Sequence, residues 1–283
     1  MKVFTTGKKL KEELAPLSAN SKSVGFVPTM GALHEGHLSL VKKALSENDY
    51  VVVSIFVNPT QFDKSEDLLK YPRTLDRDVK LLSTVSSSRI FVYAPTVEDI
   101  YERNTISESF DFGGLENEME GRFRSGHFDG VGTVVKRLLE IVEPSRAYFG
   151  EKDFQQLMII KKLVKKAKLP VNIVGCEIFR EPSGLAMSSR NERLKPKFRQ
   201  EASFIYKTLQ AAKLKFGTKS ANKVAEWVTS EFDKNKWLEL EYFTIAEVET
   251  LKPIKRKSKK KKYRAFIAAY ADGIRLIDNI ALN

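Results

Sequence analysis

Residues 23–41 read SVGFVPTMGALHEGHLSLV, an apolar run followed by a glycine-containing turn and the start of an amphipathic helix. Two further apolar runs follow, residues 50–59 (YVVVSIFVNP) and 89–95 (RIFVYAP), with helical patterns at about 37–47 and 74–83 between the runs. Apolar runs that alternate with helices are typical of strands buried on both faces of a parallel sheet. We therefore predict an α/β fold with a Rossmann-like, doubly wound parallel sheet, whose ligands bind at the carboxyl ends of the strands.

The sequence changes character near Cys176. Residues 180–191 (REPSGLAMSSRN) are polar and rich in turn-forming residues, unlike the regular pattern before them. We predict two domains, residues 1–175 with the parallel sheet and residues 176–283 as a smaller α+β domain. Their remaining elements are expected to be helices at 133–142, 154–167, 197–216 and 219–234, a short strand at 145–151, and strands of a small sheet within 238–251 and 263–282.

The composition, 42% hydrophobic and 30% charged residues, is that of a globular protein with a sizeable core. The longest apolar stretches are far shorter than the roughly 20 residues of a membrane helix, and residues 1–14 contain no apolar signal core. The single cysteine, Cys176, excludes an intrachain disulfide and a multi-cysteine metal site. We expect a cytoplasmic protein with no membrane partner.

The formal charge of +12 is concentrated in residues 255–264 (KRKSKKKKYR), and the rest of the chain carries only +4. Such a run can bind phosphate backbones, which makes an RNA-binding protein an alternative hypothesis. No RNA-binding aromatic motif accompanies it, and runs of one sign are commonly solvated loops. We interpret the stretch from Lys255 to Lys262 as a surface loop of unassigned role, so nucleic acid is not an expected partner.

His34 and His37 stand three residues apart at the start of the first predicted helix. Both imidazoles and the first backbone N–H groups of the helix can therefore converge on one anionic group. Imidazoles at this position can donate hydrogen bonds to triphosphate oxygens as charge builds on departing pyrophosphate. A zinc pair is an alternative, although zinc-binding histidines on a helix usually stand four apart and only His127 remains as a third histidine. A purely structural pair is the other alternative.

Three further segments place polar groups where strands or turns end. Residues 51–62 (VVVSIFVNPTQF) deliver the amides of Asn58 and Gln61 to the end of a predicted strand, unless this segment is a plain surface turn. Residues 149–157 (FGEKDFQQL) place Lys152 before a helix, where a cation and the helix dipole together favour an anion. Residues 184–191 (GLAMSSRN) offer backbone amides, two hydroxyls and the guanidinium of Arg190 to a polyphosphate, with a plain turn as the alternative.

These motifs resemble those of one enzyme family. Residues 34–37 match the H-x-G-H signature of the nucleotidyltransferase superfamily, and residues 29–37 (TMGALHEGH) resemble its pantothenate synthetase family more narrowly. Further segments resemble motifs of that family in its order and spacing: SIFVNPTQF (54–62), YPRTLDRD (71–78), EGRFRSGHFDGVGTVVKRLL (120–139), FGEKDFQQL (149–157), GLAMSSRN (184–191) and IRLIDN (274–279). An ordered series that covers nearly the whole chain is far more specific than any single motif.

The resemblance implies a ligase that joins pantoate to β-alanine through a pantoyl-adenylate, with ATP as substrate and Mg²⁺ as cofactor. It also implies a homodimer built through the nucleotide-binding domains and a carboxyl-terminal domain that acts as a lid. No covalent enzyme intermediate is expected, because neither Cys176 nor any serine lies in a nucleophile motif such as G-x-S-x-G.

The resemblance also assigns roles to residues. Gln61 and Gln156 would bind pantoate, with Asn58 and Arg124 as further pantoate or β-alanine contacts. Arg122, Arg124 and His127 form a basic stretch before a helix, which is either a lid over the bound nucleotide or a solvated loop. Glu120 would be a magnesium-side carboxylate. The catalytic set would be His34, His37, Lys152 and Arg190. ATP would be bound by Met30, His34, His37, Gly150, Lys152, Asp153, Phe179, Met187, Ser188, Ser189 and Arg190.

Within the superfamily, a cytidylyltransferase or a phosphopantetheine adenylyltransferase is the alternative enzyme. A site for a phosphorylated acceptor should present lysine or arginine where Gln61 and Gln156 stand. The neutral amides therefore favour a carboxylate substrate that carries hydroxyl groups.

Overall fold

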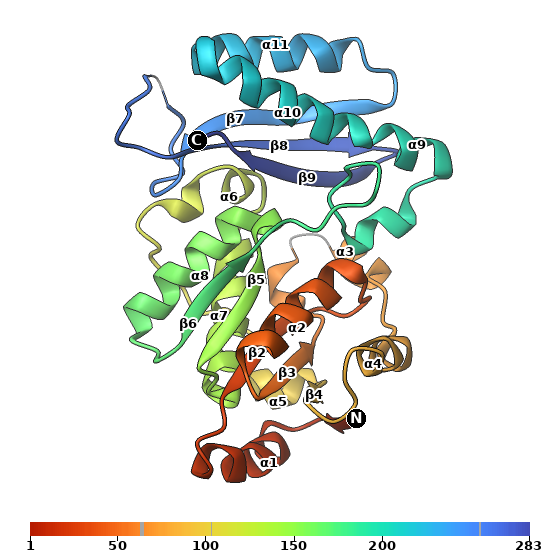
Figure 1. The fold of residues 1–283 in the computed structure, drawn as a ribbon, viewed down its shortest axis with the longest axis vertical. Coiled ribbons are helices and arrows are strands. Elements are labelled where there is room, and N and C mark those ends of the chain that lie inside the picture. The colour runs from red at the N-terminus through yellow and green to blue at the C-terminus, as the bar shows by residue number, and fades with distance from the viewer. Residues whose placement is uncertain (63–64, 103, 255) are drawn as a thin grey trace. The chain divides into compact units, whose positions relative to one another are not determined.

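The computed structural model describes residues 1–62, 65–102, 104–254 and 256–283. The chain forms two compact units: the first comprises Met1–Glu151 and Gln155–Cys176, the second Lys152–Phe154 and Glu177–Asn283. Figure 1 shows the elements of both. The predicted boundary between residues 175 and 176 lies one residue before this change of unit. The grouping of residues 152–154 with the second unit was not predicted.

The first unit contains the predicted parallel sheet. Its strand order is β1-β4-β3-β2-β5-β6, and all of its pairings are parallel. Val51, Val52 and Val53 in β3 are all fully buried, so both faces of the sheet are covered, as the continuous apolar run predicted. The strands are β1 Lys2–Phe4, β2 Val24–Thr29, β3 Tyr50–Ile55, β4 Ile90–Tyr93, β5 Arg146–Gly150 and β6 Asn172–Cys176.

The strand order places a topological switch point between β2 and β5. From β2 the chain proceeds to β3 and β4 on one side, whereas β5 and β6 lie on the other. Ligands of open parallel sheets bind at such a point, outside the carboxyl ends of the strands. Here β2 ends at Thr29, directly before the H-x-G-H segment, and β5 ends at Gly150.

The four helices predicted in this part of the chain are present, and three of them, α2, α4 and α8, match their predicted bounds within two residues. α7 begins at His127 and not at the predicted residue 133. The earlier start was missed because Gly130 and Gly132, which disfavour a helix, interrupt the apolar pattern, although both are buried in α7. The short β1 and the helices α1, α3, α5 and α6 were not predicted. The helices are α1 Gly7–Ala19, α2 Glu35–Glu47, α3 Ser65–Lys70, α4 Leu75–Ser83, α5 Val97–Tyr101, α6 Glu120–Phe123, α7 His127–Val142 and α8 Phe154–Ala167.

The second unit is the predicted smaller α+β domain, with an antiparallel sheet in the order β7-β8-β9. The β8–β9 hairpin turns at Asp272 and Gly273, both with positive φ, as is typical of an Asp-Gly turn. The single helix predicted at 197–216 is two helices that separate at Ala202. The elements are α9 Pro196–Glu201, α10 Ser203–Thr218, α11 Ala221–Asp233, β7 Leu238–Glu247, β8 Tyr263–Ala271 and β9 Ile274–Ala281.

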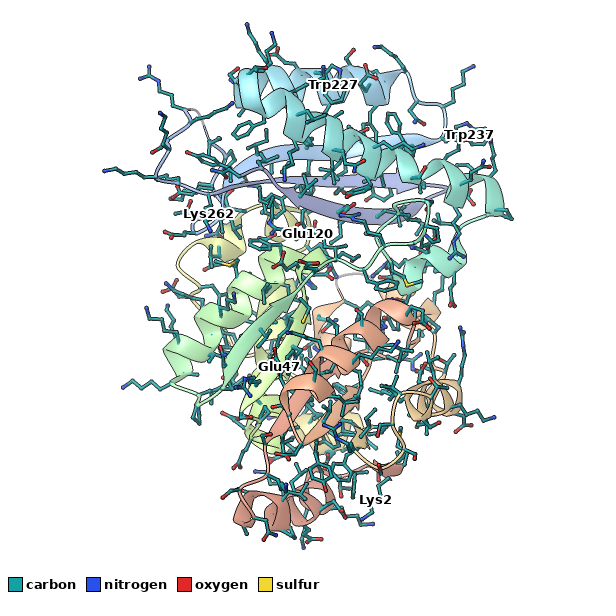
Figure 2. All side chains as sticks on the ribbon, viewed as in Figure 1. Lys2, Glu47, Glu120, Trp227, Trp237 and Lys262 are labelled. Carbon is teal, nitrogen blue, oxygen red and sulfur yellow. The ribbon has the colours of Figure 1, made fainter. Side chains whose placement is uncertain are left out.

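The basic segment lies between β7 and β8, and Lys255 falls outside the described residues. Lys261 forms an ion pair of 2.7 Å with Glu247. Lys257 lies 3.9 Å from the centroid of the Phe216 ring, and burial lowers the pKa of its ammonium group. Figure 2 shows Lys262 at the end of the segment, where it is exposed. In the described part of the chain, no helix is long and apolar enough to cross a membrane.

Two leucines of α10 in the second unit, one buried and one exposed, test how the core of this unit is packed. Leu209 is fully buried, whereas Leu214 on the same helix is 80% exposed. Leu209→Ala leaves a cavity and is expected to lower the free energy of unfolding by about 2–5 kcal/mol. Leu214→Ala is expected to change it by less than about 0.5 kcal/mol. Urea denaturation of both variants measures the difference, and equal losses would contradict this packing.

Candidate active site

The turn between β2 and α2 presents the H-x-G-H segment. The Thr29 hydroxyl donates to the Ser54 carbonyl over 2.7 Å and accepts from the Gly31 N–H over 3.2 Å. Gly31 has a φ of +83°, and a Cβ on it would lie 3.0 Å from the Ile55 side chain. This position therefore requires glycine, and the turn leaves β2 in one fixed direction.

Asp78 of α4 fixes the next two residues of this turn. Its carboxylate accepts from the Ala32 N–H over 3.0 Å and from the Leu33 N–H over 2.8 Å, and the Thr74 hydroxyl donates to it over 3.2 Å. Asp78 is fully buried, and this burial raises its pKa. Asp78 ends the YPRTLDRD motif, to which the sequence assigned no role, so this contact was missed.

His34 and His37 lie side by side at the start of α2. Their ring centroids are 4.0 Å apart with an interplanar angle of 30°, and the His34 backbone N–H donates to His37 Nδ1 over 3.3 Å. Because Nδ1 of His37 accepts this bond, the proton of the neutral ring lies on Nε2. His37 can therefore act as a hydrogen-bond donor to an anion through Nε2.

The alternative that His34 and His37 bind zinc would require a third protein ligand. Among the residues outside the gaps at 63–64, 103 and 255, no group of three or more His, Cys, Asp or Glu side chains is placed to hold a metal ion.

Gln61, Asn58 and Met30 form one contact cluster where β2 and β3 end. The Asn58 Nδ2 donates to Gln61 Oε1 over 3.3 Å, and the Gln61 Nε2 donates to Met30 Sδ over 2.7 Å. Asn58 is 1% exposed, whereas Gln61 is only partly buried. Asn58 thus orients the Gln61 amide, and Gln61 presents that amide beside the H-x-G-H turn.

The Asn58 amide is itself held from two other elements. Its Oδ1 accepts from the Tyr101 hydroxyl over 2.5 Å, and its Nδ2 also donates to the Gly130 carbonyl over 3.2 Å. A Cβ at Gly130 would lie 2.3 Å from the Thr60 carbonyl oxygen. Glycine at this position is therefore what lets α7 approach the Asn58–Gln61 segment.

Arg124 and His127 hold the backbone of Gln61. His127 Nδ1 lies 2.8 Å from the Gln61 carbonyl oxygen, to which Arg124 Nη2 also donates over 3.3 Å. Because a carbonyl only accepts, Nδ1 of His127 is the protonated nitrogen, and Nε2 accepts from Arg124 Nη1 over 3.0 Å. The structure thus joins Met30, Asn58, Gln61 and Arg124, four of the predicted site residues.

Glu120 and Gln156 lie beside the hydrogen bonds that Gln155 forms between α8 and the segment 115–120. Glu120, labelled in Figure 2, is 8% exposed in α6, and its backbone N–H donates to the Gln155 Oε1 over 3.0 Å. The Gln155 Nε2 donates to the Leu115 and Glu118 carbonyls over 2.8 and 2.7 Å. Gln155 therefore ties α8 to α6, and Gln156, next to it in α8, is half-buried.

Lys152 and Asp153 belong to the second unit. Lys152 Nζ lies 3.3 Å from Asp153 Oδ1, and the two side chains are 19% and 47% exposed. Before them, β5 ends at Gly150, where an added Cβ would meet no described atom within 4 Å.

The predicted adenine contacts are brought together by a small hairpin in the second unit. The Met187 N–H donates to the Phe179 carbonyl over 2.9 Å, and Arg180 pairs with Ala186 in an antiparallel bridge. The Phe179 side chain is 41% exposed. The backbones of Phe179 and Met187 are therefore neighbours although eight positions separate them in the sequence.

Ser188, Ser189 and Arg190 follow this hairpin at the start of a short 3-10 helix, Ser189–Arg193. The Ser188 hydroxyl accepts from the Arg190 N–H over 3.3 Å. The buried Asn191 donates to Glu181 Oε1 over 2.9 Å and to the Ala186 carbonyl over 3.1 Å. Asn191 thus fixes the segment that carries both serines and the arginine to the hairpin before it.

Cys176 is not equipped as a nucleophile. Burial raises the pKa of its thiol to about 11. At neutral pH the thiolate fraction is therefore very small, which agrees with chemistry that needs no covalent enzyme intermediate.

The family model described as pantoate-beta-alanine ligase matches residues 2–281. The chain belongs to this family. The chain is 59% identical over 283 residues to a pantothenate synthetase of Christiangramia forsetii, with the whole of both chains covered. A pantothenate synthetase of Flavobacterium psychrophilum is also 59% identical, over 282 residues, again with both chains fully covered.

Solved structures of the pantoate–β-alanine ligase family have the same fold. A pantothenate synthetase of Thermus thermophilus has a TM-score of 0.91 at 39% identity, with 100% of this chain and 99% of that chain covered. A pantoate-beta-alanine ligase of Francisella tularensis, complexed with beta-gamma ATP and beta-alanine, has a TM-score of 0.80 at 36% identity and covers 100% and 98%. The predicted family, fold class and ligase activity are confirmed.

Asp78→Asn tests the anchoring of the H-x-G-H turn. An amide would present one N–H₂ to a backbone N–H, so one of the two bonds to residues 32 and 33 is lost. We expect ligase turnover to fall about 10- to 100-fold, because a small displacement of catalytic groups has a large effect on rate. Steady-state kinetics and thermal unfolding of the variant measure the effect.

Asp76→Asn is the matched control, because it makes the same change at an exposed carboxylate of α4. It is expected to retain turnover and to change the free energy of unfolding by less than about 0.5 kcal/mol. Equal turnover of the two variants would show that Asp78 does not position the turn.

Proposed function

We propose that this ligase condenses (R)-pantoate with β-alanine in an ATP-dependent reaction that passes through pantoyl-adenylate and releases pantothenate, AMP and pyrophosphate. The observation that carries the proposal is the neutral Gln61 amide, fixed beside the H-x-G-H turn in a chain of this family. The Francisella tularensis neighbour, which is complexed with beta-gamma ATP and beta-alanine, supports ATP and β-alanine as substrates.

Pantoate is bound through amides in this proposal. The Gln61 and Gln156 side chains bind its hydroxyl and carboxylate groups. An acidic side chain there would repel the substrate, and a lysine could capture the activated acyl group. Asn58 is buried and bonded to Gln61, so it contributes by orienting Gln61. Arg124 holds the Gln61 backbone and adds a positive charge for the pantoate or β-alanine carboxylate.

In this proposal ATP contacts residues from several of the motifs. His34 and His37 donate to the triphosphate, Met30 and Gly150 line the nucleotide, and Asp153 accepts from ribose hydroxyls. Lys152 and Arg190 bring positive charge to the phosphates, with the Ser188 and Ser189 hydroxyls. The adjacent backbones of Phe179 and Met187 bind adenine. In this proposal residues 1–175 form the nucleotide- and pantoate-binding domain, and residues 176–283 act as a lid.

The chemistry consists of two displacements. A pantoate carboxylate oxygen attacks the α-phosphorus of ATP in line, the bond from that phosphorus to the pyrophosphate oxygen breaks, and an acyl-phosphate anhydride forms. The neutral amine of β-alanine then attacks the acyl carbon, AMP leaves with the bridging oxygen, and the ammonium proton is released. His37, Lys152 and Arg190 stabilise the charge that develops on the phosphates, and the amides hold pantoate in line.

Magnesium is proposed as an ion held mainly by ATP. Mg²⁺ in phosphate-transfer sites usually takes one or two protein carboxylates together with phosphate oxygens and water. Glu120 is the carboxylate that we assign to the magnesium side. The ion would neutralise phosphate charge, and the residues of this chain would still have to orient pantoate and the α-phosphate.

Two further features belong to the proposal. Two copies of the chain associate through their first units, where β6 is an edge strand with half-exposed residues and thus has backbone groups available for a partner. The protein acts in the cytoplasm.

The proposal is tested by incubating the protein with magnesium ATP and pantoate, with and without β-alanine, and by identifying the products by mass spectrometry. Pantothenate and AMP should appear only when all three substrates are present. A nucleotide joined to a phosphorylated acceptor would instead indicate a cytidylyltransferase or adenylyltransferase, and no turnover by folded protein would reject the ligase.

His37→Ala is expected to lower the rate of pantoate-dependent ATP–pyrophosphate exchange by ~100-fold, because it removes one preorganised donor to the phosphates. The control is Lys42→Ala, an exposed change on the same helix, which should leave the exchange rate unchanged. Unaltered exchange in His37→Ala would remove His37 from the mechanism.

A further inference from the structure

Asp278 and Asn279 are adjacent polar residues inside the sheet of the second unit. They belong to the IRLIDN motif in β9 and are 4% and 2% exposed. A buried carboxylate and a buried amide are costly unless their polar atoms are bonded. Their partners therefore show what the pair holds in place.

Asn279 holds the segment that carries Lys152. Its Nδ2 donates to the Lys152 carbonyl oxygen over 2.8 Å, and its Oδ1 accepts from Arg264. The Arg264 guanidinium lies 4.0 Å from the centroid of the Phe154 ring, which also contacts Phe266 of β8. These contacts explain why residues 152–154 belong to the second unit although the chain on both sides of them belongs to the first.

Asp278 holds the hairpin that leads to Ser188 and Arg190. Its two carboxylate oxygens accept from Arg180 Nη1 over 2.6 Å and from Arg180 Nη2 over 3.0 Å. The same guanidinium donates to the Gly184 carbonyl over 3.1 Å and lies 3.7 Å from the centroid of the Tyr206 ring. This bidentate pair fixes both the direction and the distance of the hairpin from β9.

The two anchors are also coupled to each other. The Asn279 N–H donates to Asp278 Oδ1 over 2.7 Å, so a shift of either side chain disturbs the other. One dipeptide of β9 is therefore bonded both to the Lys152 segment and to the hairpin that precedes Arg190, although more than 25 residues separate Lys152 from Arg180 along the chain.

We propose that Asp278 and Asn279 are positioning residues for adenylation, which hold Lys152 and the Ser188–Arg190 segment in one fixed arrangement for the triphosphate. The inference rests on the proposed function for the role of Lys152 and Arg190. Asn279 acts through the Lys152 backbone, and Asp278 acts through Arg180. In this assignment neither side chain binds substrate, because their polar groups are bonded to protein partners.

Asn279→Asp isolates the bond to Lys152. The variant keeps the side-chain size and the oxygen that accepts from Arg264, but it places a second oxygen against the Lys152 carbonyl in place of a donor. We expect pantoate-dependent ATP–pyrophosphate exchange to fall about 10- to 100-fold. The second step, measured with preformed pantoyl-adenylate and β-alanine, should keep its rate because it requires no triphosphate.

A double-mutant cycle with Lys152→Ala separates positioning from general destabilisation. If Asn279 acts through Lys152, Asn279→Asp should have little further effect on exchange in the Lys152→Ala background. Equal fold-losses in both backgrounds, or a wild-type exchange rate in Asn279→Asp, would overturn the inference. Asp272→Asn is the matched control, since it removes only the surface ion pair with Lys195 at the tip of the same hairpin.

A readout that is independent of catalysis distinguishes this inference from the proposed function. Hydrogen exchange of peptides within residues 149–157 should speed up at least tenfold in Asn279→Asp, while peptides of α11 remain unchanged. Asn279→Ala, which adds no buried charge, should give the same local change if the aspartate variant folds poorly. Unchanged exchange in these peptides would overturn the inference, whereas absence of turnover by the wild-type protein would overturn the proposed function alone.

Discussion

The contact on which the site depends most is the one between the Asp78 carboxylate and the N–H groups of Ala32 and Leu33. The turn after β2 has to leave the sheet through positive-φ residues before α2 can begin, and such a turn has no regular ladder to hold it. A fully buried carboxylate supplies the two missing acceptors, at the cost of desolvation that raises its pKa. The direction of α2, and with it the placement of His34 and His37, follows from this contact.

The two units contribute different chemistry to the proposed reaction. In the first, an amide cluster around Gln61 is oriented by buried neutral groups and by Arg124 and His127 on its backbone. In the second, the proposed cations are Lys152 and Arg190. The Lys152 carbonyl and Arg180, which precedes the Ser188–Arg190 segment, are both bonded to one strand, β9. Neutral donors suit a carboxylate that must remain nucleophilic, and cations suit a phosphate that gains charge in the transition state.

Much of the fold could be predicted because its signals are local. The apolar run of β3 is buried on both faces, and α8 spans Phe154–Ala167 as its apolar period predicted. The start of α7 was missed because the glycine at position 130 is required by a tertiary contact, the close approach of α7 to Thr60, which the local sequence does not reveal. The role of Asp78 was missed for the same reason, since its partners lie more than 40 residues away. Family motifs located the candidate residues, but only the contacts show that Asn58 acts on Gln61 and that residues 152–154 belong with β9.

Activation of pantoate on the α-phosphorus of ATP can be measured by following the oxygen atoms of the pantoate carboxylate. Pantoate labelled with heavy oxygen in its carboxylate is converted with ATP and β-alanine, and the products are weighed by mass spectrometry. Attack through an acyl-adenylate predicts one labelled oxygen in each AMP, because the bridging oxygen leaves with the nucleotide. Unlabelled AMP, or label in inorganic phosphate with ADP as the nucleotide product, would exclude activation through an acyl-adenylate.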